Sequence, residues 1–376
     1  MGRTNPYRYG APVSGSQFTG RHAELRAVAD RMRNGINILV LSPRRYGKTS
    51  LIEKAAGRVS REGAAVVYVN ALGVADKAEF AMALLSALYR VKGGRWHRTR
   101  QAVPEFLSRI RLKPSVSFDG TTPSFSVEPS LSAADLSTAV ADVYALLAGM
   151  SEPDRPVVLI VDEFQDVLKI DEHLPAQFKA LADEHPKVSL VIAGSKRHVM
   201  QQLVLDAAAP LYGMTTPFAL EPIPADEMAD FLVRRANAGG KNLTVELADR
   251  IVTLAGPVPN DIQYLAYEVY AAAGRQITAR DVETGMRMAV EHAADLHATR
   301  FEVMSPTQRR VVKHLALCGG AAQPYSAEFR RATHISSPGT LRNALTPLVK
   351  DGVVTDSGGS YRVADPFFAA WLRTRS

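Results

Sequence analysis

The stretch SPRRYGKTSLI (42–52) contains residue types that bind phosphate groups. Gly47, Lys48 and Thr49 match the end of the phosphate-loop pattern G-x-x-x-x-G-K-[ST], and Ser42 stands where that pattern begins with Gly. In such a loop, backbone N–H groups surround the phosphates, the lysine reaches the β- and γ-phosphates, and the hydroxyl binds Mg²⁺. The alternative is a chance GKT at the start of a helix. The predicted nucleotide-binding residues are Ser42, Pro43, Arg44, Arg45, Tyr46, Gly47, Lys48, Thr49 and Ser50.

Two carboxylates follow the apolar run VVLIV, in VVLIVDEFQ. The carboxyl ends of parallel strands lie where α/β sheets bind ligands. Asp162 suits a Walker B role, in which it would hold Mg²⁺ together with Thr49. Glu163 could polarise the attacking water as a general base. The alternative is a charged helix cap after a core strand.

A third candidate is Ser195, at the end of the run VSLVIAGS. It would orient the water near the γ-phosphate, or it would cap the following helix. Lys196 and Arg197 could contact phosphate or a partner, although solvated charges are the simpler interpretation. The predicted catalytic residues are therefore Glu163, Lys48 and Ser195.

The elements that must position these residues alternate along the first part of the chain. Near-continuous apolar runs alternate with helical periodicity, which predicts a parallel sheet covered on both faces. The five predicted strands are INILVLS and residues 64–70, 157–162, 187–195 and 217–223. Helices are expected at 21–35, 48–60, 75–91 and 96–111, and a hairpin insertion at 113–130.

The rest of the chain has a different pattern. Residues 224–300 predict consecutive helices, and residues 301–376 predict helix, short helix, helix and a Gly-tipped hairpin. That order is typical of a winged helix-turn-helix. The predicted domains are thus an α/β core at 1–223, an all-α lid at 224–300 and a winged helix at 301–376.

The charge of the chain permits an acidic partner for this last domain. The formal net charge is +7, and residues 301–376 hold ten Lys or Arg against five Asp or Glu. Double-stranded DNA is one such partner, and a protein is the alternative, because winged helices also bind proteins. The predicted DNA-binding residues are Arg330, Arg331, Arg342, Lys350 and Arg362.

Several stretches in order, among them SPRRYGKTSLI, VDEFQDV, GSKRH, PLYG and YRVADPFFAAWL, resemble the archaeal-type ATPases of the AAA+ class. The resemblance covers nearly the whole chain and lies close to the origin-recognition-like and STAND branches of P-loop proteins. It implies a P-loop sheet, a helical lid and a C-terminal winged helix, and it implies that the lead-in NPYRYG and the helix from Arg21 lie near the adenine.

The chain departs from this pattern at Met214, because related sequences often carry Arg after LYG. Arg44, Arg45 or Arg197 could compensate, or hydrolysis could be slow. No sensor 2 arginine can be identified in the predicted lid.

Other chemistry is not expected. One cysteine, Cys318, excludes a disulfide within the chain and is expected to be a buried thiol. His292 and His297 lack metal-ligand spacing and are expected on a helix surface. No signal peptide, membrane span or membrane partner is expected, and a cytoplasmic setting fits best.

The sequence therefore predicts an ATPase with ATP and Mg²⁺ as cofactors, which couples its nucleotide state to DNA through the winged helix. The alternative is a slow, STAND-like signalling switch whose winged helix binds protein. A nucleotide-dependent homo-oligomer is compatible with either.

Overall fold

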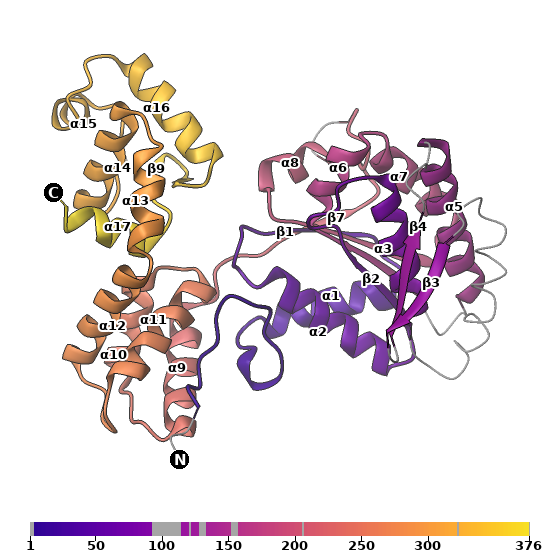
Figure 1. The fold of residues 1–376 in the computed structure, drawn as a ribbon, viewed down its shortest axis with the longest axis horizontal. Helices are drawn as coiled ribbons and strands as arrows, with labels where there is room; N and C mark the ends of the chain where they lie inside the picture. The colour runs from indigo at the N-terminus through magenta and orange to yellow at the C-terminus, as the bar shows by residue number, and fades with distance from the viewer. Residues whose placement is uncertain are drawn as a thin grey trace. The chain divides into compact units, whose positions relative to one another are not determined.

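The computed structural model describes residues 4–91, 114–119, 122–127, 133–151, 157–204, 207–321 and 323–375 (Figure 1). The contacts within the chain define two compact units. One is Pro12–Pro222, and the other joins Met1–Ala11 to Ile223–Ser376. The finer division into three domains stays a prediction.

The first unit is built on five parallel strands in the order β2-β5-β6-β1-β7, so the predicted sheet is confirmed. Strand β6 separates β1 from β5, which brings the ends of all three strands to one edge of the sheet. β7 lies at the outer edge and is largely exposed, which agrees with Pro217 within it. The strands are β1 Ile38–Leu41, β2 Ala65–Asn70, β5 Val157–Asp162, β6 Val188–Gly194 and β7 Thr216–Ala219.

Helices cover both faces of this sheet because successive strand residues point to opposite sides. Ile38 and Val40 pack under α1 His22–Arg33 and α2 Lys48–Arg61. Leu39 belongs to the core on the opposite face. That core contains residues of α3 Lys77–Tyr89, α5 Ala133–Met150 and α7 Leu174–Glu184.

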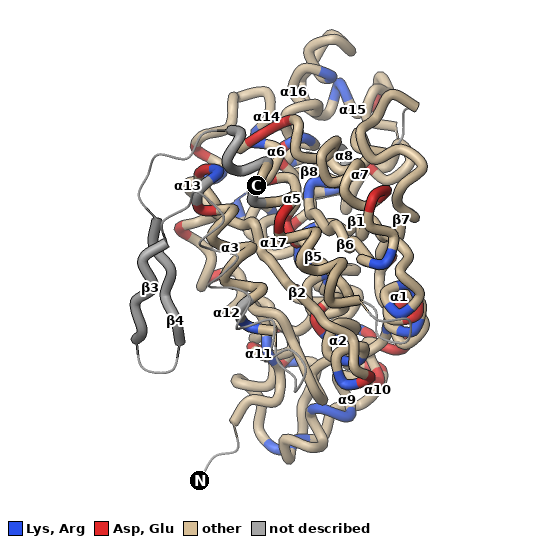
Figure 2. Tube along the Cα trace, turned by 90° about the vertical axis from the view of Figure 1, so that its right-hand side faces the viewer, with Lys and Arg blue, Asp and Glu red and all other residues tan. Residues whose placement is uncertain are grey.

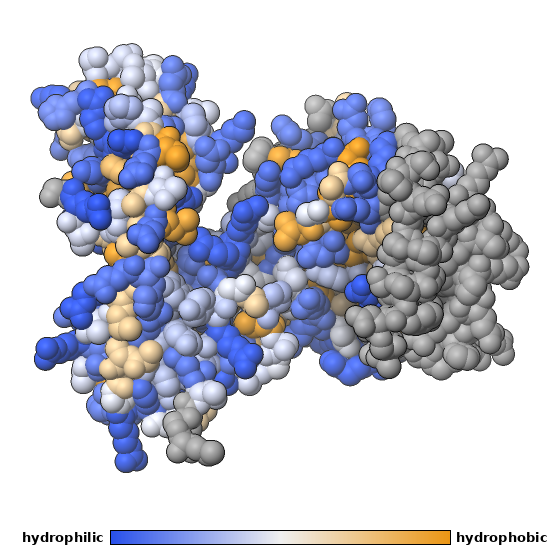
Figure 3. Space-filling model, viewed as in Figure 1, coloured by the Kyte–Doolittle hydropathy of each residue, from blue (hydrophilic) through white to orange (hydrophobic). Residues whose placement is uncertain are grey.

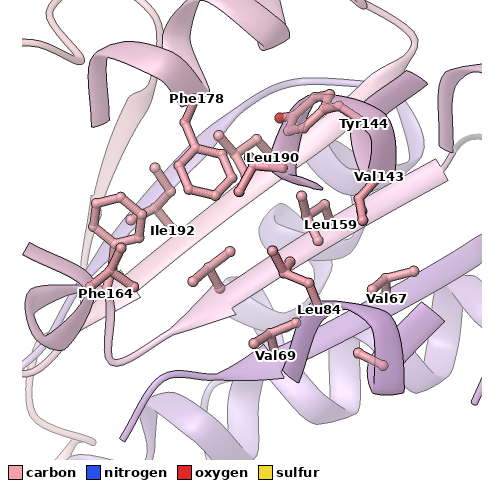
Figure 4. Packing of buried hydrophobic residues seen from close by; sticks show 14 of the residues in the cluster. Val67, Val69, Leu84, Val143, Tyr144, Leu159, Phe164, Phe178, Leu190 and Ile192 are labelled. Carbon is pink, nitrogen blue, oxygen red and sulfur yellow. The ribbon is translucent and has the colours of Figure 1, made fainter. Parts of the chain in front are cut away.

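Figure 4 shows this second core, where Phe164 and Phe178 meet beside the strands. Their ring centroids lie 5.7 Å apart in an edge-to-face arrangement. Burying each such side chain contributes about 1.5–3 kcal/mol, so these layers stabilise the edge of the sheet that holds the candidate site.

Short elements complete the first unit. The predicted hairpin consists of antiparallel β3 Pro114–Asp119 and β4 Thr122–Val127. The helix expected at 96–111 lies outside the described residues. The remaining elements are η1 Gly15–Gln17, η2 Phe164–Asp166, α6 Val167–Ile170 and α8 Arg197–Gln202.

Five helices begin the second unit and enclose a core that also takes in Tyr7 from the N-terminal segment. The buried Tyr7 hydroxyl donates to the carbonyl of Leu232 at 2.7 Å. The Arg235 guanidinium donates to the carbonyl of Pro6 at 2.8 Å. The helices are α9 Ala225–Gly239, α10 Val245–Ala255, α11 Pro259–Ala272, α12 Ala279–His292 and α13 Ala294–Glu302.

The winged helix follows, with its own core. Ser305 starts α14 with a capping box, and Ala321 pairs with Tyr361 to add one bridge to the hairpin. Helix α17 contributes Phe367 to the core of the preceding helices and Phe368 to that of the winged helix. The elements are α14 Pro306–Cys318, α15 Ala327–Ala332, α16 Pro338–Lys350, β8 Val354–Ser357, β9 Ser360–Val363 and α17 Pro366–Arg373.

Two expectations for single residues are wrong. His297 is not on the surface: it is 2% exposed, and its ring faces Phe368 and Trp371 of α17. Cys318 is exposed rather than buried, because it lies on the last turn of α14 away from the core. Its sulfur lies 3.6 Å from Nε2 of His314, one helical turn earlier.

No helix among the described residues combines the length and the apolar character needed to cross a bilayer.

Candidate nucleotide site

The loop between β1 and α2 has the backbone that a phosphate loop requires. Gly47 has φ 85° and ends the loop, so glycine avoids a left-handed strain there. Arg45 also has a positive φ, whereas Ser42 does not. Ser42 is buried, and its hydroxyl donates to the carbonyl of Pro43 at 2.9 Å. A serine is therefore compatible with the first loop position.

Lys48 and Thr49 begin α2 and point to the end of β5. The Lys48 ammonium contacts the Asp162 carboxylate and lies 3.0 Å from Oε1 of Glu163. The Thr49 hydroxyl donates to Oδ2 of Asp162 at 2.8 Å. The structure thus brings together the predicted loop and the two predicted carboxylates, which are separated in sequence but adjacent across the sheet edge.

Glu163 follows β5 in an unusual backbone conformation. Its φ of 54° and ψ of 41° lie in the left-handed region, which costs a non-glycine residue about 1 kcal/mol or more. Its own N–H donates to Oδ1 of Asp162 at 2.8 Å. Strain of this kind is common at functional sites.

Ser195 follows β6 and lies beside Glu163. Its hydroxyl donates to Oε2 of Glu163 at 2.8 Å. It does not cap the following helix, because the cap position of α8 is Lys196 and no side chain bonds there. The capping interpretation is wrong, and the water-orienting role stays a prediction.

The electrostatics keep Glu163 ionised. Burial acts to raise its pKa, but the Lys48 charge and hydrogen bonds from Gln165, Lys48 and Ser195 together lower it below its ordinary value. One ammonium faces two carboxylates, Asp162 and Glu163, so this cluster favours a further cation. Asp162 and Thr49 supply adjacent hard oxygen atoms of the kind that Mg²⁺ prefers. The residues present therefore fit this ion.

Three residues near the site were not predicted from the sequence. The Tyr68 hydroxyl donates to Oδ2 of Asp162 at 3.0 Å, and burial raises the pKa of this tyrosine. Gln165 donates to Oε2 of Glu163. The buried Arg21 donates to the carbonyls of Tyr46 and Glu221, at 3.0 and 2.9 Å. Gln165 had a signal, because it stands two positions after Glu163, and the resemblance implied that the helix from Arg21 lies near the adenine. Tyr68 had no such signal.

The other predicted site residues are placed less centrally. Arg44 and Arg45 are exposed on the loop. The Ser50 hydroxyl accepts the N–H of Val13 at 2.9 Å, so it fixes the N-terminal lead to α2. Met214 packs against the α/β core, and nothing is described for the side chain of Arg197.

The predicted DNA-binding residues all lie in the winged helix. Arg342 and Lys350 are exposed on α16, and Arg362 is exposed on β9. Figure 2 colours the Lys and Arg positions of the trace blue. Arg330 on α15 is partly buried and donates to the carbonyl of Ser336 at 2.7 Å. An open hollow of about 470 Å³ adjoins α15, and it is lined by Ala327, Arg330, Arg331, His334, Ile335 and Ser336.

A parallel sheet in this order, a phosphate loop and an acidic strand end define a P-loop ATPase. The chain belongs to the family described as "ATPase domain predominantly from Archaea", which matches residues 18–265. Residues 296–374 match "Probable winged helix domain". The protein is therefore an archaeal-type ATPase with a C-terminal winged helix, and the predicted family and enzyme class are confirmed.

Solved structures share this fold at low sequence identity. A Walker-type ATPase of Pyrococcus abyssi is 18% identical, with a TM-score of 0.65 and coverage of 98% of this chain and 99% of that one. The ORC2 protein of Aeropyrum pernix, in ADPNP and ADP complexes, is 14% identical, with a TM-score of 0.54 and 96% coverage of both chains. The ORC1 protein of the same organism, in complex with DNA, is 15% identical, with a TM-score of 0.50 and coverage of 96% and 94%. No curated protein shows significant similarity to this chain.

Proposed function

We propose that this ATPase hydrolyses ATP with Mg²⁺ and couples its nucleotide state to contact with double-stranded DNA. The observation that carries the DNA contact is the placement of Arg331, Arg342, Lys350 and Arg362, which are exposed on α15, α16 and the wing. Basic side chains spaced over such elements suit the phosphates of a duplex. Hydrophilic residues, coloured blue, cover much of the visible face of this domain in Figure 3.

In the proposed mechanism, Lys48 and the loop N–H groups bind the β- and γ-phosphates. Thr49 and Asp162 would hold Mg²⁺, which neutralises phosphate charge when bound. Glu163 accepts the proton of the attacking water, and Ser195 stays close to it through its 2.8 Å bond to Oε2. In this structure, Lys48 contacts both carboxylates. When phosphate binds, Lys48 would leave these carboxylates and contact phosphate oxygens instead.

Helix α17 supports the coupling to the winged helix. Its Phe367 packs against Tyr264 of α11 with ring centroids 5.0 Å apart, while Phe368 and Trp371 pack in the winged-helix core. A movement of the helices at 225–302 would therefore carry α17 and the winged helix with it. Such an element can pass a nucleotide-dependent change to a DNA-binding surface.

The experiment is ATP turnover at low salt, with and without duplex DNA, for the wild type and Glu163→Gln. The proposal expects turnover that rises with DNA and falls about 100-fold or more in the variant, as expected for loss of a general base. The coupling would be overturned if the rate of ATP turnover does not change with DNA and the affinity for duplex DNA does not change with salt.

A second candidate function is a slow nucleotide switch whose winged helix binds protein. Met214 favours it, because this partly buried methionine stands where related sequences often carry Arg, and an arginine there could stabilise the charge of the transferred phosphoryl group. If this candidate is right, the wild type and Glu163→Gln should both bind ATP tightly and hydrolyse it at a negligible rate. The protein should also form oligomers or bind a protein partner in a nucleotide-dependent manner, without DNA.

A further inference from the structure

Gln165 links the ends of two strands of the sheet. It is 4% exposed and belongs to η2, directly after Glu163 and Phe164. Its Oε1 accepts the N–H of Ser195 at 3.1 Å, and its Nε2 donates to Oε2 of Glu163. The backbone N–H of Ser195 can only donate, and the ionised carboxylate of Glu163 can only accept. These two neighbours therefore fix which way the Gln165 amide is oriented.

The neighbouring backbone leaves room for this amide. Gly194 ends β6, and a Cβ there would lie 2.6 Å from Oε1 of Gln165. That Cβ would also lie 2.5 Å from Sδ of Met200, so a larger residue would displace one or both of these side chains. The glycine therefore leaves the amide its place between the two strand ends. The bridge spans β5 and β6 at the edge where the phosphate loop also lies.

The two carboxylate oxygens of Glu163 have different partners. Oε2 accepts from Gln165 and Ser195, which belong to the sheet edge. Oε1 accepts from Lys48, at 3.0 Å. In a phosphate loop the lysine binds the β- and γ-phosphates. When ATP binds, Oε1 of Glu163 would therefore lose the Lys48 donor, whereas Oε2 would keep its donors.

From this asymmetry we propose that Gln165 is a positioning residue for ATP hydrolysis. It holds Oε2 of Glu163 at the sheet edge, so that Oε1 becomes the proton acceptor after Lys48 moves to the phosphates. Glu163 has a left-handed backbone, and the bonds from Gln165 and Ser195 hold its Oε2 in place. The inference rests on the proposed role of Glu163 as general base.

The test compares Gln165→Met, which has similar length and no amide, with the wild type. We expect kcat to fall about 10-fold or more. This loss is a part of the total contribution of a general base, which is about 10²–10⁴-fold. KM for ATP and the Kd of mant-ADP should change less than about threefold, because Gln165 does not face the phosphates. Gln323→Met, at an exposed position of the winged helix, is the matched control and should leave both unchanged.

The decisive comparison repeats the substitution in a Glu163→Gln background. In that background, Gln165→Met should change the residual rate of turnover less than about twofold, because the carboxylate that Gln165 would hold is already absent. Equal losses in both backgrounds, or a loss of mant-ADP binding as large as that of kcat, would mean a structural role and overturn the inference.

The failures of the two proposals are distinguishable. Wild-type turnover in Glu163→Gln would overturn the role of Glu163 and the inference with it. Loss of turnover in Glu163→Gln with wild-type kcat in Gln165→Met would overturn the inference alone. Turnover without DNA stimulation would overturn only the coupling to DNA.

Discussion

At the scale of single residues, the two carboxylates of the site are held in the same manner. Lys48 contacts both Asp162 and Glu163, and each acid has a second donor that does not bind phosphate. For Glu163 this is Gln165, and for Asp162 it is Tyr68. In the proposed mechanism, these donors would hold the two carboxylates while Lys48 moves to the phosphates.

Removing the Tyr68 hydroxyl should weaken the proposed magnesium site. Tyr68→Phe keeps the ring on β2 but removes the 3.0 Å bond to Oδ2 of Asp162. Among the residues that the structure describes, that oxygen then keeps Thr49 as its donor. Loss of such an outer contact typically costs about 10–100-fold in metal affinity. We expect the Mg²⁺ concentration for half-maximal ATP turnover to rise about 10-fold. Tyr212→Phe, at an exposed position, is the control, and an equal Mg²⁺ requirement in both variants would contradict the prediction.

At the scale of elements, the helices α11 and α12 approach each other closely at one glycine. A Cβ on Gly285 of α12 would lie 2.6 Å from the backbone nitrogen of Val269 on α11 and 2.8 Å from its Cα. Backbone atoms cannot move aside as side chains can. The close packing of the two helices therefore depends on this glycine.

Gly285→Ala should separate these helices and destabilise the protein. Overpacking of this kind costs about 1–3 kcal/mol, which exceeds the gain of about 0.5–1 kcal/mol from replacing a helical glycine. Urea unfolding measures the difference. Gly149→Ala in α5 is the matched control, since nothing lies within 4 Å of its added Cβ. We expect that variant to be neutral or slightly more stable, and equal stability of the two variants would contradict the prediction.

His297 makes the packing of α13 against α17 dependent on pH. Burial lowers its pKa; Asp365 acts to raise it, and Arg300 to lower it further. The neutral form is therefore favoured in the folded state. Since the folded pKa lies below the unfolded value of about 6.5, the stability is complete above that pH and is lost as the pH falls toward the folded pKa.

Thermal unfolding from about pH 7.5 to about pH 5.5 tests this. We expect His297→Leu to lose less stability over this range than the wild type, because it has no imidazole to protonate. His173→Gln changes a histidine whose side chain is 86% exposed, and it should follow the wild type. Equal slopes for all three proteins would exclude His297 as the source.

At the scale of the whole molecule, the elements could be predicted more completely than the contacts. Apolar runs predict β1, β5 and β6 well, since every residue of these strands is buried. The edge strand β7 is largely exposed, and the predicted range 217–223 extends past its observed end at Ala219. Lys48, Thr49, Asp162 and Glu163 followed from motif and position. Tyr68 could not, because its role depends on the pairing of β2 with β5, which places it opposite Ile160 and lets its hydroxyl reach Asp162. His297 was expected on the surface because α17, which packs against its ring, lies far along the chain.

The charge distribution of the whole chain leads to the last prediction. If the exposed basic residues of the winged helix bind DNA phosphates, affinity should fall steeply with salt. Arg342→Gln removes one such charge from α16, so the slope of log K against log salt should become shallower by about one. Arg287→Gln on α12 removes an equal charge outside the winged helix, where Arg287 lies 3.9 Å from Glu291. Duplex binding between about 50 and 200 mM salt distinguishes the two. The same decrease for both variants would mean that only net charge matters, and an unchanged slope for Arg342→Gln would place the DNA contact elsewhere.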